Sequence, residues 1–413
     1  MSQLLLNATS NPGTPATNKA GLFYDSADQK VKVAKDLGYT ITLSNDGMQD
    51  RNVLDNGGMA VQQKVAAAST AIAGISTTTR AGVVADRFAV TASVASNLNW
   101  AQIDTATTLE TGLTSRYYGS IISASAGKKV MISQWLENMQ MVGLRGYQVR
   151  LSVKTSQKVG TTGQKYRLGL LYLTAGGTTD TCPTFLTGAW SVTTAVDPAF
   201  AATLLPITPD ANTPENGTIT GNYLDILTTV AWQKSSCTFT IPATAKNLMV
   251  VLFADATGGT TDNFSVSEFA LTKGPELVSY ERPPFAEELI RCQRWYSKSF
   301  PYAVVPAAAV AVATGGTGIA GIIGKAAATA LAVKIPIRFP VQMRATPTIT
   351  LFTPVGAGAV PYRIDGTTPA VQTAVAQVGP TDSGVTVTAT GDASGAVGDL
   401  VGVHFTASCE AVT

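Results

Sequence analysis

The segment YQVRLSVK, Tyr147–Lys154, decides the fold class of this chain. Apolar and polar side chains alternate along it with a period of two, which is typical of a β-strand: Val149, Leu151 and Val153 against Arg150, Ser152 and Lys154. The alternation predicts that one face of the strand packs in a core and that the other is in contact with water.

Runs of the same kind recur along most of the chain, and Gly, Asn, Asp or Pro separate them. Short strands at this spacing are typical of an antiparallel β-sandwich or jelly roll, so we predict an all-β fold. No repeat of fixed period is evident, which argues against a solenoid or a propeller. The other predicted strands are Leu22–Tyr24, Lys30–Val33, Tyr39–Leu43, Tyr166–Leu173, Cys237–Ile241, Leu248–Ala254, Phe264–Leu271, Val333–Phe339, Thr348–Phe352, Gly384–Thr390 and Val401–Ala407.

The strands and the turns between them predict five segments. The segments are an extended N-terminal arm (1–20), a small β-meander (21–52), a β-sandwich (53–282), a short amphipathic helix (283–300) and a C-terminal β-domain (301–413). The meander buries too little apolar surface to be stable alone, so we expect it to need a symmetry mate or another protein.

One segment, PPFAEELIRCQRWYSKSF at Pro283–Phe300, predicts a helix of about 13 residues. Two prolines suit its first positions, and Glu287 and Glu288 follow in the first turn, near the positive end of the helix dipole. Glu287 also precedes Arg291 by four residues, which is favourable for an ion pair. The predicted apolar stripe is Phe285, Leu289, Cys292 and Trp295 or Tyr296. We expect the helix to dock on a β-domain, and its two adjacent glutamates to form no catalytic pair.

The composition narrows the class of protein. Charged residues are only 14% of the 413 residues and the net charge is +2, with the basic residues scattered. A basic face for nucleic acid or for a membrane surface is therefore not predicted. The N-terminal residues 1–15 lack the features of a signal peptide, and the uncharged stretch 301–324 is too rich in Ala, Gly and Thr for a spanning helix. We expect no membrane insertion.

Cysteine and histidine chemistry is sparse. Cys182, Cys237, Cys292 and Cys409 fit no zinc module, and we expect reduced thiols, with a Cys182–Cys237 disulfide as the alternative. His404 is the only histidine, which weakens every mechanism that uses histidine as a base or a metal ligand. We predict no cofactor.

Candidate acids and sugar platforms are present but form no motif. Glycan hydrolysis needs two carboxylates at a defined separation, and the candidates are Asp180, Asp255, Asp262 and Glu268, which we interpret as solvated loop acids. The loop Asp255–Asn263 could hold calcium, although a plain hairpin loop is the simpler interpretation. Aromatic side chains that could stack on a sugar are Trp100, Tyr117, Tyr118, Trp190 and Trp232, and each is more often core or interface. We predict no catalytic or metal residues and assign no ligand-binding residues.

Several of these segments together resemble bacteriophage virion proteins of the tail-fibre and head-fibre type. The similar segments are GLFYDSADQKVKV (21–33), NVLDNGGMAVQQ (52–63) followed by ADRF (85–88), LRGYQVRLSVKTS (144–156), CTFTIPATAKNLMVVLFA (237–254), FSVSEFALTKG (264–274), ERPPFAEELIRCQRWYSKS (281–299) and FPVQMRATPTIT (339–350). In that family a Trp often follows the Asp-Arg pair, where this chain has Phe88.

The resemblance implies a location in the virion, a homotrimer, and a sandwich like that of carbohydrate-binding modules. It implies a non-enzymatic fibre whose N-terminal arm fastens to other virion proteins and whose β-domains adhere to host-surface polysaccharide. Two alternatives stay open: a capsid decoration, cement or collar protein that binds no receptor, and a polysaccharide-degrading tailspike. Fold similarity alone does not confer a sugar site.

Overall fold

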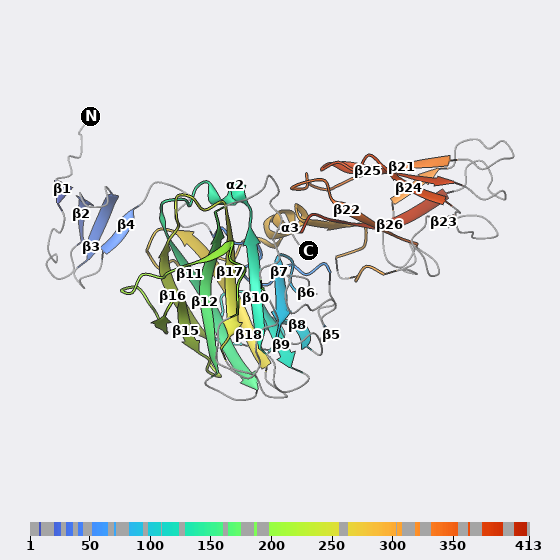
Figure 1. Ribbon diagram of the computed structural model, residues 1–413. Coiled ribbons are helices and arrows are strands. Elements are labelled where there is room, and N and C mark those ends of the chain that lie inside the picture. The colour runs from blue at the N-terminus through green and yellow to red at the C-terminus, as the bar shows by residue number, and fades with distance from the viewer. Residues whose placement is uncertain are drawn as a thin grey trace. The chain divides into compact units, whose positions relative to one another are not determined.

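A computed structural model of the chain shows an antiparallel β-protein with three short helices among the residues that it describes (Figure 1). The described residues are 8–9, 20–25, 30–35, 40–43, 52–64, 70–71, 82–93, 98–108, 110–123, 129–159, 164–174, 186–187, 198–255, 263–302, 304–307, 319–322, 332–353, 362–363, 374–390 and 400–410. They divide into two compact units, one of residues 1–51 with 272–274 and one of the remaining chain.

The N-terminal unit holds a four-stranded sheet in the order β1–β2–β3–β4. Its strands are β1 (Ala8–Thr9), β2 (Ala20–Asp25), β3 (Lys30–Lys35) and β4 (Thr40–Leu43). The strands β2 to β4 form the predicted antiparallel meander, and β1, from the predicted arm, adds to the edge of β2 in parallel.

A β-sandwich of two sheets makes up most of the second unit, as the period-two patterns predicted. The eight-stranded sheet has the order β14–β15–β12–β17–β10–β7–β6, and β13 also pairs with β12. Its strands are β6 (Gly82–Val83), β7 (Phe88–Ala92), β10 (Val130–Leu136), β12 (Lys165–Leu173), β13 (Leu204–Ile207), β14 (Thr218–Thr220), β15 (Tyr223–Leu227) and β17 (Asn247–Ala254).

The six-stranded sheet has the order β16–β11–β18–β9–β8–β5. Its strands are β5 (Thr70–Ala71), β8 (Leu98–Asp104), β9 (Tyr117–Ser123), β11 (Gln148–Val159), β16 (Gln233–Thr240) and β18 (Asn263–Lys273). Two one-turn helices that the sequence pattern did not predict, α1 (Thr105–Thr108) and α2 (Asn138–Met141), lie between strands.

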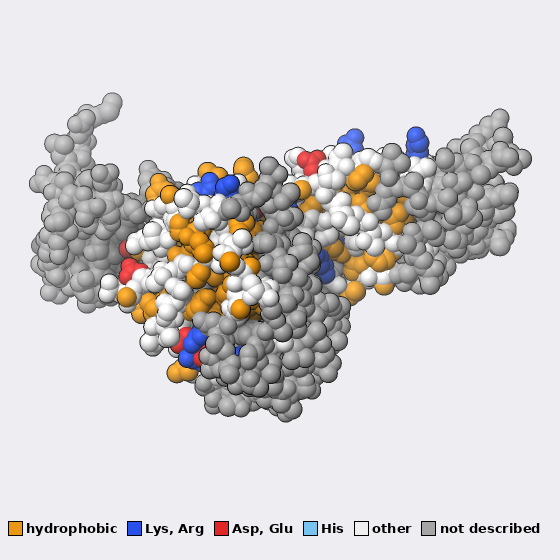
Figure 2. All heavy atoms as spheres, viewed as in Figure 1, with side chains coloured by type: hydrophobic (Ala, Val, Ile, Leu, Met, Phe, Trp, Pro, Cys, Tyr) orange, Lys and Arg blue, Asp and Glu red, His pale blue; other side chains and the backbone are white. Residues whose placement is uncertain are grey.

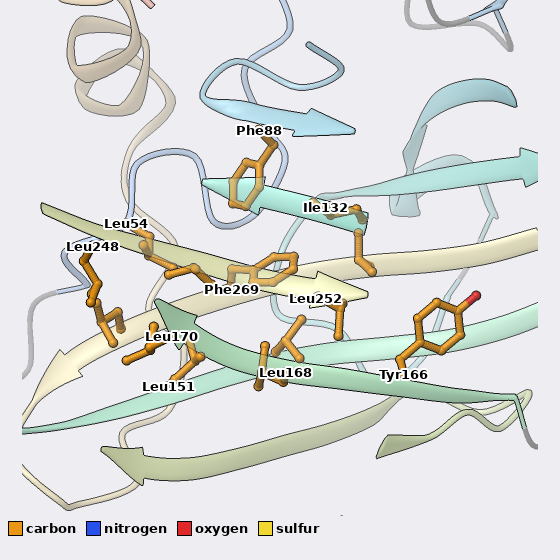
Figure 3. Packing of buried hydrophobic residues seen from close by; sticks show 14 of the residues in the cluster. Leu54, Phe88, Ile132, Leu151, Tyr166, Leu168, Leu170, Leu248, Leu252 and Phe269 are labelled. Atoms are coloured by element: carbon orange, nitrogen blue, oxygen red, sulfur yellow. The ribbon is translucent and has the colours of Figure 1, made fainter. Parts of the chain in front are cut away.

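The core lies between the two sheets, where alternate residues of facing strands interdigitate. Leu168 and Leu170 of β12 pack there with Leu252 of β17, Ile132 of β10 and Phe269 of β18 (Figure 3). The eight-stranded sheet is buried on its other face too. There Leu171, Met249 and Phe253 form a second apolar cluster with Leu186 and Leu204.

The predicted helix is shorter than the sequence suggested. Helix α3 (Phe285–Gln293) ends before Trp295, and the chain turns at once into strand β19 (Tyr296–Lys298), which pairs with β26 (Leu400–Ser408). The prediction of one helix over 283–300 was wrong at its C-terminal end, because hydrogen bonds to β26 replace the last helical turn.

The remaining strands form two further β-sheets. Strand β26 pairs with β19, β20 (Ile319–Ile322), β22 (Thr348–Phe352) and β23 (Tyr362–Arg363), while β21 (Ala332–Arg338), β25 (Gly384–Thr390) and β24 (Ala374–Val378) form a separate sheet. Apolar side chains of both sheets, among them Ile335, Val387 and Phe405, share one core. Among the described residues, no helix is both long and apolar enough to cross a membrane.

Candidate functional site

The outward side of the six-stranded sheet differs from the water-exposed face that the alternation predicted. Opposite the buried Val149, Leu151 and Val153, the side of β11 that was expected to be wet carries Ser152, which is only 4% exposed. We call this side the polar face and define it by the outward side chains of four strands: Tyr118, Ser120, Arg150, Ser152, Lys154, Lys234, Ser236, Thr238, Ser265, Ser267 and Glu268.

Neighbouring chain segments pair with the free edge of β16, beside the polar face. The backbone of Glu215 pairs with that of Ser236, and the N–H of Asp210 donates to the carbonyl of Thr238 at 2.8 Å. The hydroxyl of Ser236 in turn donates to Oε2 of Glu215 at 2.9 Å. Hydroxyl groups that are buried but hydrogen-bonded in this way cost little stability.

An aromatic pair marks one border of the polar face. The rings of Tyr118 on β9 and Trp232, just before β16, meet edge to face with their centroids 5.1 Å apart. Tyr118 is buried and Trp232 is half-buried, and Nε1 of Trp232 donates to Oε2 of Glu110 at 3.2 Å. The exposed residues Val230 and Ala231 precede the Trp, so apolar surface lies directly beside hydrogen-bonding groups.

A buried carboxylate joins this border to the middle of the sheet. Glu268 has a backbone φ of +53°, and both it and Ser267 face outward before Phe269 returns to the core. Its Oε1 accepts the N–H groups of Thr114 and Ser115, and its Oε2 lies 2.8 Å from Nζ of Lys154. The side chain therefore fixes the loop that precedes β9 and neutralises one cation.

A hydroxyl and amide cluster lies on β9 and β18 next to the aromatic pair. The hydroxyls of Ser120 and Ser265 both donate to Oδ1 of Asn263, the latter at 3.3 Å. Ser120 follows Tyr118 by two residues and so lies on the same side of β9. The polar face thus offers ring surface, hydroxyl, amide and charged groups within one sheet.

The other predicted sugar platforms and acids are placed elsewhere. Trp100 is fully buried in the core, Tyr117 points away from Tyr118 on β9, and Trp190 lies outside the described residues. Asp180 and Asp262 also lie outside them. Asp255 is buried against Lys165 at 2.9 Å and Arg167 at 3.4 Å, so it is a paired structural acid and not the solvated loop acid that we predicted. Glu268 was mispredicted in the same way.

A calcium site is not assigned. Within the described part of the chain, no three His, Cys, Asp or Glu side chains come together as metal ligands. Most of the loop that we considered for calcium, residues 256–262, is outside that part.

A second polar cluster lies where helix α3 meets the sandwich. Asp55 forms two ion pairs: its Oδ1 lies 2.8 Å from Nη2 of Arg291, and its Oδ2 lies 3.2 Å from Nε of Arg87. The guanidinium of Arg87 lies 3.3 Å from the ring centroid of Trp295. Glu288 of α3 accepts the N–H of Asn56 at 2.5 Å. The segments NVLDNGG, ADRF and AEELIRCQRW therefore meet in one buried network. Its charged groups pair with one another across the contact, which indicates that the network joins the helix to the sandwich.

The thiols and the histidine of the described residues are buried. Cys237, Cys292 and Cys409 are free thiols, as predicted, and Cys182 lies outside the described residues. Burial raises the pKa of the Cys237 thiol to about 12, which keeps it protonated and unreactive. His404 is fully buried and stacks on Phe300, which fits the predicted packing role.

Comparison with known proteins gave distant matches among solved structures. No protein-family model and no curated protein matches the chain. Among solved structures, the chain is similar to the module TmCBM61 in complex with β-1,4-galactotriose, at 11% identity and a TM-score of 0.29, over 54% of this chain and 99% of that one.

Two further solved structures are similar over about half of this chain. A xylan-binding domain from CBM 22 matches at 14% identity and a TM-score of 0.27, over 49% of this chain and 95% of that domain. The enzymatically active domain of tailspike protein 4 from bacteriophage CBA120 matches at 7% identity and a TM-score of 0.30, over 54% of this chain and 21% of that one. These similarities are distant, and the antiparallel β-sandwich rests on the strands and sheets described above.

Proposed function

We propose that this protein is a non-catalytic, carbohydrate-binding fibre protein of a bacteriophage particle, and that the polar face of its sandwich holds the glycan. The observation that carries the proposal is the half-buried Trp232, braced edge-on by Tyr118 beside a dense set of hydrogen-bonding side chains. A pyranose presents C–H groups on one face and hydroxyls around its rim, so it needs ring surface and polar groups side by side.

The placement of the acids supports binding without catalysis. A glycosidase needs one protonated and one charged carboxyl at the scissile bond. Glu268 is engaged by two backbone N–H groups and Lys154, and Asp255 lies between Lys165 and Arg167. Both acids are thus engaged in contacts within the protein.

The proposed place in the virion follows from the resemblance of the segments quoted above. In this proposal the N-terminal sheet fastens a homotrimer to other virion proteins, and the sandwich contacts polysaccharide of the host surface. The sequence similarity of helix α3 and of its partners in the sandwich supports the family, and the polar face supports the ligand class.

A binding experiment tests the function. Purified protein should be retarded by specific members of a panel of bacterial and plant polysaccharides in affinity electrophoresis, and should block adsorption of the phage when in excess. Trp232→Ala should weaken the binding about thirtyfold, because truncating an aromatic anchor costs about 2 kcal/mol.

Tyr147→Ala is the matched control, since Tyr147 is an exposed aromatic residue outside the polar face. It should leave binding unchanged. Retention on purified particles with no polysaccharide bound would instead identify a decoration protein, and release of reducing sugar would identify a depolymerase.

A further inference from the structure

The polar face brings three cationic side chains, Arg150, Lys154 and Lys234, together on two neighbouring strands. Strands β11 and β16 are in register so that Lys154 lies directly opposite Lys234, and Arg150 lies opposite Thr238 four residues earlier on β11. Like charges directly across a strand pair destabilise a sheet. Of the three cations, Lys154 forms an ion pair with Glu268.

The other two cations have neutral partners. Arg150 donates to the hydroxyls of Ser236 at 2.8 Å and Thr238 at 3.3 Å, and to the carbonyl of Pro275 at 3.4 Å. Lys234 donates to the carbonyl of Val278 at 3.1 Å. Among the described residues neither forms an ion pair with a carboxylate, and the nearby Glu215 accepts the hydroxyl of Ser236.

This environment penalises the positive charge of Lys234. Burial lowers the pKa of its ammonium group, the neighbouring cations Lys154 and Arg150 lower it further, and Glu215 and Glu268 oppose the effect. Lys234 and Arg150 are both partly exposed, so a ligand can reach them. An anion placed between them would relieve the repulsion and exchange neutral acceptors for charge-assisted hydrogen bonds, which are about twice as strong.

We propose that the glycan bound on the polar face is acidic, and that Arg150 and Lys234 recognise its anionic groups while Trp232 contacts a sugar ring. The proposal rests on the carbohydrate-binding function proposed above and names its ligand class. A guanidinium fork and an ammonium on adjacent strands suit the carboxylates, sulfates or phosphates that recur along an acidic polysaccharide.

The test uses polymer pairs that differ only in charge: polygalacturonate, alginate and hyaluronate, each beside its carboxyl-reduced form. The full-length protein should bind at least one acidic polymer about tenfold or more tightly than its reduced partner, and this preference should shrink as salt is added. Lys234→Gln and Arg150→Gln should each remove most of the preference for the acidic polymer over its reduced partner.

Two controls separate recognition from folding. Lys234→Arg keeps the charge and should keep the preference, while Lys334→Gln removes an exposed charge on β21, outside the sandwich, and should have no effect. Thermal unfolding of each variant shows whether the fold is retained.

Equal binding of acidic and reduced polymers would overturn the proposal of an acidic ligand and would leave the proposed carbohydrate binding intact. A preference that survives both Gln variants would overturn the role of these residues. Binding of no polymer, here or in the wider panel, would overturn both proposals.

Discussion

At residue scale, Gly119 shows how closely side chains of neighbouring strands pack within the six-stranded sheet. A Cβ atom built on Gly119 would lie 1.8 Å from Cη2 of Trp100, and 2.6 Å from two other atoms of that ring. The indole is fixed at its far side, where Nε1 donates to Oε1 of Gln62 at 3.0 Å. The ring therefore has no room to retreat, and only glycine fits at this position of β9.

Gly119→Ala should consequently destabilise the sandwich by about 2–3 kcal/mol, the cost of overpacking a rigid core. The measurement is urea unfolding followed by tryptophan fluorescence. Gly146→Ala is the control, because nothing lies within 4 Å of its added Cβ and only its φ of +75° opposes the change. It should cost about 1 kcal/mol. Equal costs at the two positions would contradict the close contact with Trp100.

At the scale of elements, helix α3 shows what periodicity can and cannot predict. The helical pattern correctly located the element and the burial of Cys292 and Trp295. It misassigned the rest of the face, since Phe285 is 42% exposed and Glu288 is buried. The partners that make burial of Glu288 tolerable, Asn56 and Arg291 with Asp55, lie more than 200 residues away or on the next turn. Local spacing carries no information about them.

The sheets, too, could be predicted from the sequence only in part. The sequence located β12, β22 and β25 almost to the residue. Strands β22 and β25 bury every second side chain in one core, whereas β12 is an apolar run that is buried on both faces. The polar face could not be predicted, because it depends on the register of β11 with β16 and on the distant segment that pairs with the edge of β16. Trp232 was a candidate among five aromatics, and only its contact with Tyr118 distinguishes it.

The buried Glu288 makes the attachment of α3 sensitive to pH. Burial raises its pKa above the ordinary 4.5, although the charge of Arg291 and the N–H of Asn56 oppose the effect. The folded protein therefore keeps the proton of Glu288 to a higher pH than the unfolded chain does. Its stabilising contribution is complete below the ordinary pKa and is lost as pH rises through the folded pKa.

Glu288→Gln cannot ionise, yet its amide oxygen can still accept the Asn56 N–H. Relative to the wild type, the free energy of unfolding of this variant should therefore increase as pH rises from about 4 to about 7. Urea unfolding at several pH values measures the difference. Glu287→Gln removes the same charge from the exposed side of the helix and controls for its general effect. A difference that falls with pH would show that the Arg291 pair outweighs burial.

At the scale of the whole molecule, the described surface carries few charges. Figure 2 shows hydrophobic and uncharged polar atoms over most of the described area, with a few basic and acidic side chains between them. Met139, Val142 and Leu227 are among the large apolar side chains that are more than half exposed. Monomeric soluble proteins usually carry more charge than this chain, and exposed apolar surface often marks association.

The proposed fibre is accordingly expected to be a homotrimer, with a mass near three times the 42.8 kDa of the chain, or about 128 kDa. The four-stranded N-terminal sheet is too small to bury a core of its own, so association is expected to depend on it.

Light scattering measures the mass in solution of the full chain and of a truncated chain that begins at Asn52. The full chain should be trimeric and the truncated chain should lose most of the association, because the sandwich retains its own core. A full chain with the mass of one subunit would contradict the trimer. A truncated chain that stays trimeric would instead place the association in the β-domains.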